Sequence, residues 1–174
     1  MATTGYKSFD VSGNSSTGSV LGEIRRMLRE LFDTTVGGIV SVTNATVTIT
    51  PALHAGKTIT LNRAAGITAT LPAATGTGDK YKFIVGTTFT GSGIIQVVGD
   101  DTMCGNAIVA QDAGDTAVVF EAGATADTVT LNGTTTGGLK GAVVELQDIA
   151  ADTWFVHVVT AATGIEATPF SAAV

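Results

Sequence analysis

Apolar and polar residues alternate along most of this chain, in short stretches separated by glycine, asparagine or aspartate. Alternation with a period of two is typical of β-strands that bury one face. It predicts strands over these ranges: 39–50, 58–61, 67–71, 80–86, 94–98, 107–110, 116–121, 127–131, 141–147 and 153–159. Strands at intervals of about 8 to 14 residues predict a mainly β domain, which is an antiparallel β-sandwich, a jelly-roll-like fold or a β-barrel.

One stretch, 19–33, follows a helical period instead. Its apolar residues recur at steps of three and four: Leu21, Ile24, Leu28 and Leu31, with Phe32 at the edge of the stripe. Ser19 is a plausible N-cap for this short helix. Two roles stay open for this stripe. It can close one end of the β core, or it can dock on a partner or a second copy, because the stripe would otherwise be exposed to solvent.

These patterns divide the chain into three segments: an N-terminal arm and amphipathic helix at 1–38, a β domain at 39–160, and a C-terminal tail at 161–174. Both terminal segments are rich in small or polar residues, which predicts flexible arms. In the first arm Tyr6 and Phe9 either bury against a partner or are merely tolerated in a tail. The hypothetical partner-binding residues are therefore Tyr6, Phe9, Leu21, Ile24, Leu28, Leu31 and Phe32.

Composition narrows the class of partner. The net charge of -6 at pH 7 disfavours binding to nucleic acid and to anionic membranes. No run approaches the roughly 20 apolar residues of a membrane-spanning helix, and the polar first 20 residues predict no secretion signal. Only 14% of residues are charged while 44% are hydrophobic, so the surface is expected to be largely threonine, serine, glycine and alanine, which suits contact with other protein subunits.

Candidate chemistry is sparse, and the sequence predicts no catalytic residue, no cofactor and no metal site. His157 shares a predicted strand face with Phe155 and Val159, which favours a structural histidine, and His54 falls in a predicted loop. No nucleophile stands in a recognisable arrangement with a histidine and a carboxylate. Cys104 is expected to be a small buried side chain rather than a reactive thiol.

Carboxylates in predicted turns are the remaining candidates for a metal site. Asp100 and Asp101 form one pair, and Asp112 and Asp115 form another. Calcium sites draw oxygen ligands from such turns, but the spacing of an EF-hand loop is missing here. Aspartate is also frequent in turns because it bonds its own backbone, so these residues predict turns rather than a metal site.

Four phrases of the sequence carry a resemblance: TITLNRAAGITATLPAATGTGDKYKFIVG, IIQVVGDDTMCGNAIV, DTVTLNGTTTGGLKGAVVELQDIAADTWFVHVV and GIEATPFSAA. The resemblance covers about 59–173, and it is to small structural proteins of tailed bacteriophages, most of all capsid decoration (cement) proteins. The resemblance implies a β-rich homotrimer on the outer surface of the virion capsid. Its partners would be the major capsid protein and its own copies, with terminal arms reaching across neighbouring capsid subunits.

Two other classes of function stay open. A tail-fibre, baseplate or receptor-binding module would share a trimeric β architecture, but it should expose an aromatic or charged recognition patch. A chain with one Trp and two Tyr has little material for a carbohydrate-binding platform. A small virion hydrolase would require His54 or His157 to meet a carboxylate in a pocket.

Overall fold

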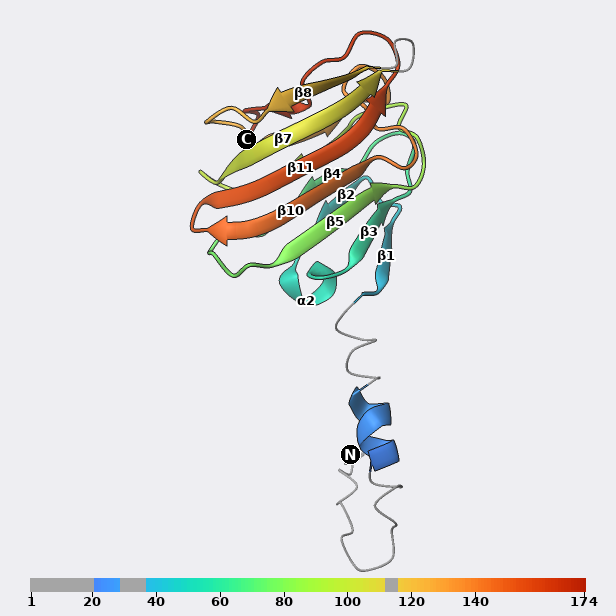
Figure 1. Ribbon diagram of the computed structural model, residues 1–174, viewed down its shortest axis with the longest axis vertical. Helices are drawn as coiled ribbons and strands as arrows, with labels where there is room; N and C mark the ends of the chain where they lie inside the picture. The colour runs from blue at the N-terminus through green and yellow to red at the C-terminus, as the bar shows by residue number, and fades with distance from the viewer. Residues whose placement is uncertain (1–20, 29–36, 112–115) are drawn as a thin grey trace, which may run out of the picture. The chain divides into compact units, whose positions relative to one another are not determined.

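The computed structural model describes residues 21–28, 37–111 and 116–174 (Figure 1). The chain divides into two units, Met1–Val36 and Gly37–Val174, and each is considered by itself. In the first unit, residues 21–28 form a helix whose side chains are all exposed. The predicted helix is thus confirmed over 21–28, and the rest of its predicted range lies outside the described residues.

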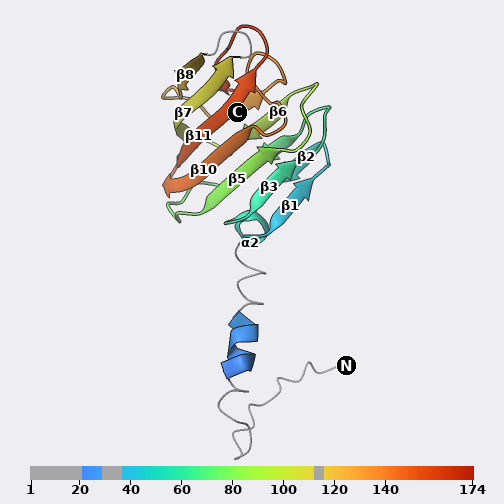
Figure 2. The same ribbon diagram turned by 45° about the vertical axis from the view of Figure 1, so that its right-hand side comes forward.

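The second unit is a two-layered β structure, which confirms the prediction of a mainly β sandwich. Figure 1 shows the larger sheet in front, and Figure 2 shows β6 and β2 of the smaller sheet behind it. In spatial order the seven-stranded sheet contains β1 (Ile39–Val42), β3 (Thr58–Leu61), β5 (Lys80–Val85), β10 (Val143–Ala150), β11 (Thr153–Ala162), β7 (Thr102–Gln111) and β8 (Ala117–Glu121). The five-stranded sheet contains β12 (Phe170–Ser171), β9 (Thr128–Leu131), β6 (Gly93–Gln96), β4 (Thr68–Thr70) and β2 (Thr46–Thr48).

The sequence pattern predicts antiparallel strands, but the strands of this fold are not all antiparallel. Among the described residues, five of the ten strand pairings are parallel. The reason is the path of the first six strands, which alternate between the two sheets instead of forming hairpins. As a result β1, β3 and β5 run parallel in one sheet, and β2, β4 and β6 run parallel in the other.

The turns that cross from the larger sheet to the smaller one are stacked on each other. The N–H of Asn62 donates to the carbonyl of Val42 at 2.8 Å, and the N–H of Gly86 donates to the carbonyl of Leu61 at 2.9 Å. This stacking is tight enough to require glycine at Gly66, where φ is +100° and a Cβ atom would lie 2.2 Å from the carbonyl oxygen of Ser92. The turns therefore continue the register of the strands around the edge of the sandwich.

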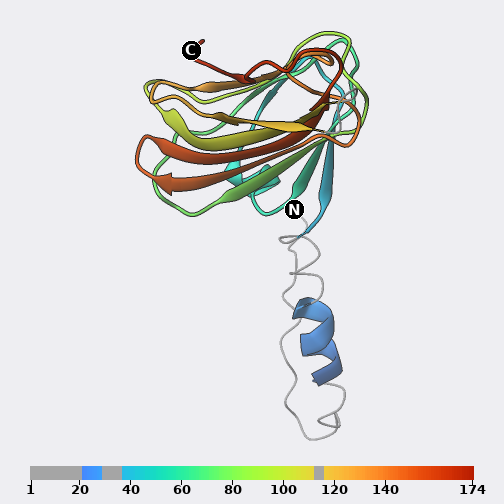
Figure 3. The same cartoon turned by 45° about the horizontal axis from the view of Figure 1, so that its top comes forward.

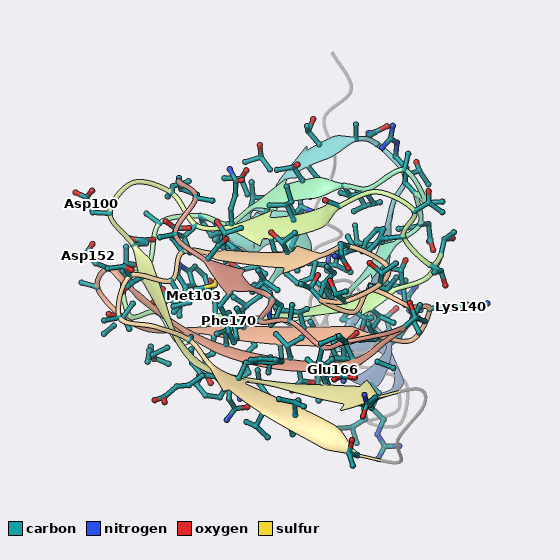
Figure 4. All side chains as sticks on the ribbon, turned by 90° about the horizontal axis from the view of Figure 1, so that it is seen from above. Asp100, Met103, Lys140, Asp152, Glu166 and Phe170 are labelled. Atoms are coloured by element: carbon teal, nitrogen blue, oxygen red, sulfur yellow. The ribbon has the colours of Figure 1, made fainter. Side chains whose placement is uncertain are left out.

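Side chains in most strands alternate between the core and the outer surface. In β11, Trp154, Val156 and Val158 face the core while Phe155 and Val159 face outward. The two layers are seen obliquely in Figure 3, and in the view from above in Figure 4 Met103 of β7 and Phe170 of β12 both lie between them. The core is therefore the space between the sheets, where side chains of both layers meet.

Buried carboxylates fasten loops to this core. Oδ2 of Asp101 accepts a hydrogen bond from the backbone N–H of Ala74 at 2.7 Å and one from Nε1 of Trp154 at 3.3 Å. Asp127 accepts from the backbone N–H groups of Ala173 and Val174. Hydrogen bonds to a carboxylate are strong, so each of these side chains acts as an anchor for a separate stretch of chain.

Most predicted strands are found within a few residues of their expected positions, with three differences. The range 39–50 divides into β1 and β2, and it is followed by a short helix, α2 (Pro51–His54), that begins at the proline. β7 begins at Thr102, five residues before its predicted start. The range predicted as a tail, 161–174, contains the end of β11 and all of β12, where Phe170 is buried and Ile165 is exposed.

Candidate protein-binding surface

The predicted partner-binding residues fall into two groups. Leu21, Ile24 and Leu28 lie on the helix 21–28, where they are 56%, 40% and 47% exposed and are joined by Met27. Their spacing places them on one side of the helix, as expected. The other members of the set, Tyr6, Phe9, Leu31 and Phe32, lie outside the described residues. Partner binding by the exposed stripe therefore remains a prediction.

A second apolar surface lies on the outer face of the seven-stranded sheet. The strand register aligns five aliphatic residues, one on each of five neighbouring strands: Ile84, Val143, Val159, Ile108 and Val119. We call this set the apolar row. At the usual strand spacing it spans about 19 Å. Val159 is 45% exposed and Val119 is 63% exposed, so the row is open to solvent toward β8.

The neighbouring row on the same face is polar. It comprises Thr58, Lys82, Glu145, His157, Asn106 and Glu121, aligned across six strands. Nζ of Lys82 lies 3.0 Å from Oε1 of Glu145, and Nδ1 of His157 lies 2.8 Å from Oδ1 of Asn106. These contacts between neighbouring strands give the row a fixed order of charges and hydrogen bonds.

The outer face of the five-stranded sheet has a different character. Its outward positions include five threonines, Thr46, Thr48, Thr68, Thr70 and Thr130, and Ile94 and Gln96 of β6 lie beside them. Such a face carries hydroxyl groups but neither charge nor a run of aliphatic side chains. The aliphatic surface of the sandwich is therefore on the larger sheet.

Both histidines have hydrogen-bonded ring nitrogens. His157 lies on the outer face of β11 with Phe155 and Val159, as predicted, and is bonded to Asn106. His54 is buried at the end of α2, where its Nδ1 accepts from the N–H of Thr50 at 3.0 Å. The helix therefore replaces the predicted loop at this position. His157 also faces Glu145 across the strands, but that carboxylate is paired with Lys82.

The prediction that Cys104 is buried is wrong. Its side chain is exposed on the outer face of β7. The cause is strand parity, because Met103 occupies the inward position and the next residue must point the other way. Across the strands Cys104 is aligned with Phe155, which is also outward-facing.

Turn carboxylates do not gather around a common centre in the described part of the chain, where no group of three or more His, Cys, Asp or Glu side chains is placed to hold a metal ion. Asp101 is engaged with Ala74 and Trp154, and Asp100 is exposed. Asp112 and Asp115 lie outside the described residues. The buried carboxylates thus have backbone partners rather than a shared ligand site.

Three groups have perturbed acidity, and each shift has a structural cause. Burial raises the pKa of Tyr81 to about 12, with smaller contributions from the negative charges of Asp79 and Asp148. Burial would raise the pKa of Asp127, but hydrogen bonds from Ala173, Thr128 and Val174 lower it. In Asp148 burial is likewise outweighed, and the N–H groups of residues 75–77 lower the pKa to about 2. The shifts strengthen the charge states that these groups ordinarily have near neutral pH, with Tyr81 protonated and both carboxylates ionised.

No protein-family model matches this sequence, and a search of curated proteins finds no match to it. Neither helix in the described ranges is long and apolar enough to span a membrane.

The apolar row was not among the predicted site residues, although the sequence contained part of its signal. Valine and isoleucine at outward positions of 116–121, 141–147 and 153–159 were visible as strand residues. Their alignment depends on which strands are neighbours, and strand order is not encoded in the alternation itself. The structure supplies that order.

Proposed function

We propose that this protein is a structural component of a phage virion that decorates the capsid and binds other protein subunits, including its own copies as a homotrimer. The observation that carries the proposal is the apolar row, five aliphatic side chains aligned across the outer face of the larger sheet. Ile84, Val143 and Ile108 are half-buried, while Val159 and Val119 carry the row to solvent, and contiguous apolar surface that reaches solvent marks protein contact sites in soluble proteins. The resemblance of 59–173 to decoration proteins names the class of partner.

The exposed helical stripe supports the same proposal. Leu21, Ile24 and Leu28 offer a second apolar surface on a unit separate from the sandwich. A protein with two such surfaces can contact two neighbouring subunits at once. In a trimer the number of contacts is multiplied, so the combined affinity exceeds that of any single contact.

The proposed mechanism is mechanical. Bridging contacts that exist only between correctly spaced capsid subunits stabilise that arrangement of the shell, because a ligand shifts an equilibrium toward the state it binds best. The occupied histidines fit a structural role, since His54 and His157 are each hydrogen-bonded within the fold. The pairing of Glu145 with Lys82 fits it as well.

The decisive experiment is to locate the chain in the phage particle. Particles should be imaged by cryo-electron microscopy with and without an antibody fragment raised against residues 37–174. Extra density over the capsid surface, at three-fold positions, is expected. Density on the tail or baseplate would favour the tail-fibre or receptor-binding alternative, and particles with no added density would contradict a virion role.

A further inference from the structure

A basic hollow lies on the outer face of the seven-stranded sheet, at the end near the β10–β11 hairpin. Its volume is about 450 Å³, and the side chains that matter here are Lys57, Lys80, Lys82, Glu145, Gln147 and Phe155. It opens beside the polar row, with which it shares Thr58, Lys82 and Glu145. Nothing in the capsid proposal requires this hollow, and the following inference does not depend on that proposal.

The hollow has the opposite charge from the rest of its unit. In Gly37–Val174 acidic residues outnumber basic residues by eleven to five, yet three of those five basic residues line this one site. Lys82 is paired with Glu145 at 3.0 Å. Lys57 and Lys80 have no ion-pair partner among the described residues. Two ammonium groups of the hollow are therefore not engaged in an ion pair, although the unit is acidic.

Backbone contacts hold these lysines around the hollow. The N–H of Gly56 donates to the carbonyl of Lys80 at 2.8 Å, which fixes the segment before β3 against the start of β5. Gly56 adopts a φ of +71°, a turn conformation that favours glycine. The next residue is Lys57, and Thr58 is then aligned with Lys82 in the parallel pairing. Strand register thus brings Lys57 beside Lys80 and Lys82, which share one face of β5.

The wall of the hollow opposite Lys57 has side chains that suit a peptide. Phe155 is 40% exposed, and its strand partner Gln147 is in turn aligned with Lys80. An aromatic ring beside an amide and two ammonium groups can contact a methylene chain while the charges meet a carboxylate. This is the composition that a glutamate- or aspartate-bearing segment would match.

We propose that the basic hollow binds an acidic segment of a partner protein, with carboxylates between Lys57 and Lys80 and aliphatic atoms against Phe155. Charge complementarity favours this occupant. A nucleic acid presents closely spaced phosphates along its length and needs a track of basic residues to match them, whereas this acidic unit offers one cluster of three lysines. A single carboxylate can instead approach the two unpaired lysines.

The test uses the full chain and a fluorescein-labelled hexaglutamate peptide, with fluorescence anisotropy as the readout. Lys57→Gln together with Lys80→Gln should weaken binding by roughly tenfold, because each exposed pair contributes up to about a factor of five. Lys140→Gln is the matched single-charge control for Lys80→Gln. Lys140 lies just before β10, at the end of the sandwich away from Asp152 in Figure 4, and should leave binding unchanged. Lys80→Arg keeps the charge and should also keep binding.

The proposal has clear ways to fail. Equal losses in Lys80→Gln and Lys140→Gln would mean that only the overall charge matters, and would overturn the site. An absence of binding at millimolar peptide would overturn it too. Tighter binding of a twelve-residue oligothymidylate at the same salt concentration, lost in the double variant, would replace the acidic peptide with a nucleic acid as the occupant. Circular dichroism of each variant verifies that the sheet is intact.

Discussion

The backbone N–H of Gly76 donates a 2.6 Å hydrogen bond to Oδ1 of Asp148, although the two residues are separated by 72 positions in the chain. The same carboxylate accepts from the N–H groups of Thr75 and Thr77 and from the hydroxyl of Thr77. Asp148 therefore organises the turn between β4 and β5 from a position on β10. One side chain fixes the geometry of a loop that belongs to a different part of the sequence.

Replacing Asp148 with Asn should destabilise the fold by about 2 kcal/mol, since an amide accepts fewer N–H groups and adds its own donor to a site full of donors. The folded pKa of about 2 lies below the ordinary value of 3.8. The carboxylate thus contributes stability that is fully present above about pH 5 and is lost as the pH falls from about 4 through about 2. Urea denaturation at several pH values measures this.

The matched control is Asp100→Asn, which removes the same charge from an exposed turn position. Its stability at neutral pH should change by less than about 0.5 kcal/mol. Part of the acid sensitivity should remain in Asp148→Asn, because the pKa of Asp127 is also lowered. Identical pH profiles for the parent and Asp148→Asn would contradict the assignment.

Trp154 should contribute strongly to the stability of the core. It is the single tryptophan of the chain, 1% exposed, and its ring meets that of Tyr81 edge-on at 5.7 Å. Trp154→Phe removes the hydrogen bond to Asp101 and part of the packing, so a loss of about 2 to 3 kcal/mol is expected. Denaturation followed by circular dichroism tests this, with the neighbouring outward substitution Phe155→Leu as the nearly neutral control.

Gly105 should tolerate no side chain. It has a φ of +142°, and a Cβ atom would lie 1.9 Å from the carbonyl oxygen of Val156 on the paired strand. Gly105→Ala should therefore lower the free energy of unfolding by about 2 kcal/mol or more, through strain and displacement of β7 from β11. Gly123→Ala has open space and should change stability little. A similar melting temperature for both variants would refute the prediction.

The apolar row can be tested without disturbing the core. Val159→Asp places a carboxylate in the middle of the row at an outward position, so the fold should persist while self-association is lost. Sedimentation velocity should show the proposed trimer for the parent and a monomer for Val159→Asp. Thr46→Asp is the matched control, because it adds the same charge to the outer face of the smaller sheet. A trimer that survives Val159→Asp would exclude the row as the self-contact.

The helical stripe makes a separate prediction. Leu28→Asp should reduce binding to the capsid by about tenfold or more, because a charge enters an apolar contact, while the melting of the sandwich stays unchanged. Arg25→Gln changes the net charge by the same amount and should have little effect. Co-sedimentation with capsids measures both variants. Equal binding of Leu28→Asp and the parent would show that the stripe does not dock on the shell.

The pattern of apolar positions was sufficient for the strands but not for their order. β3, β5 and β11 begin at their predicted residues, because alternation records which side chains face the core. Parallel pairing of β1 with β3 could not be predicted in this way, since a strand has the same alternation whichever neighbour it takes. The same limit applies to the candidate surfaces. The helical stripe is local and was predicted, whereas the apolar row and the basic hollow arise from register between distant segments.

The spatial order of the larger sheet has a consequence for synthesis. β10 and β11 occupy its middle, between β5 and β7, yet they follow both in the chain. Until residues 143–162 have left the ribosome, β5 and β7 each present an unpaired edge of backbone hydrogen-bonding groups, which is a site for association with other chains. A chain ended before residue 143 would keep most of its strands but lose the pair that joins them into one sheet.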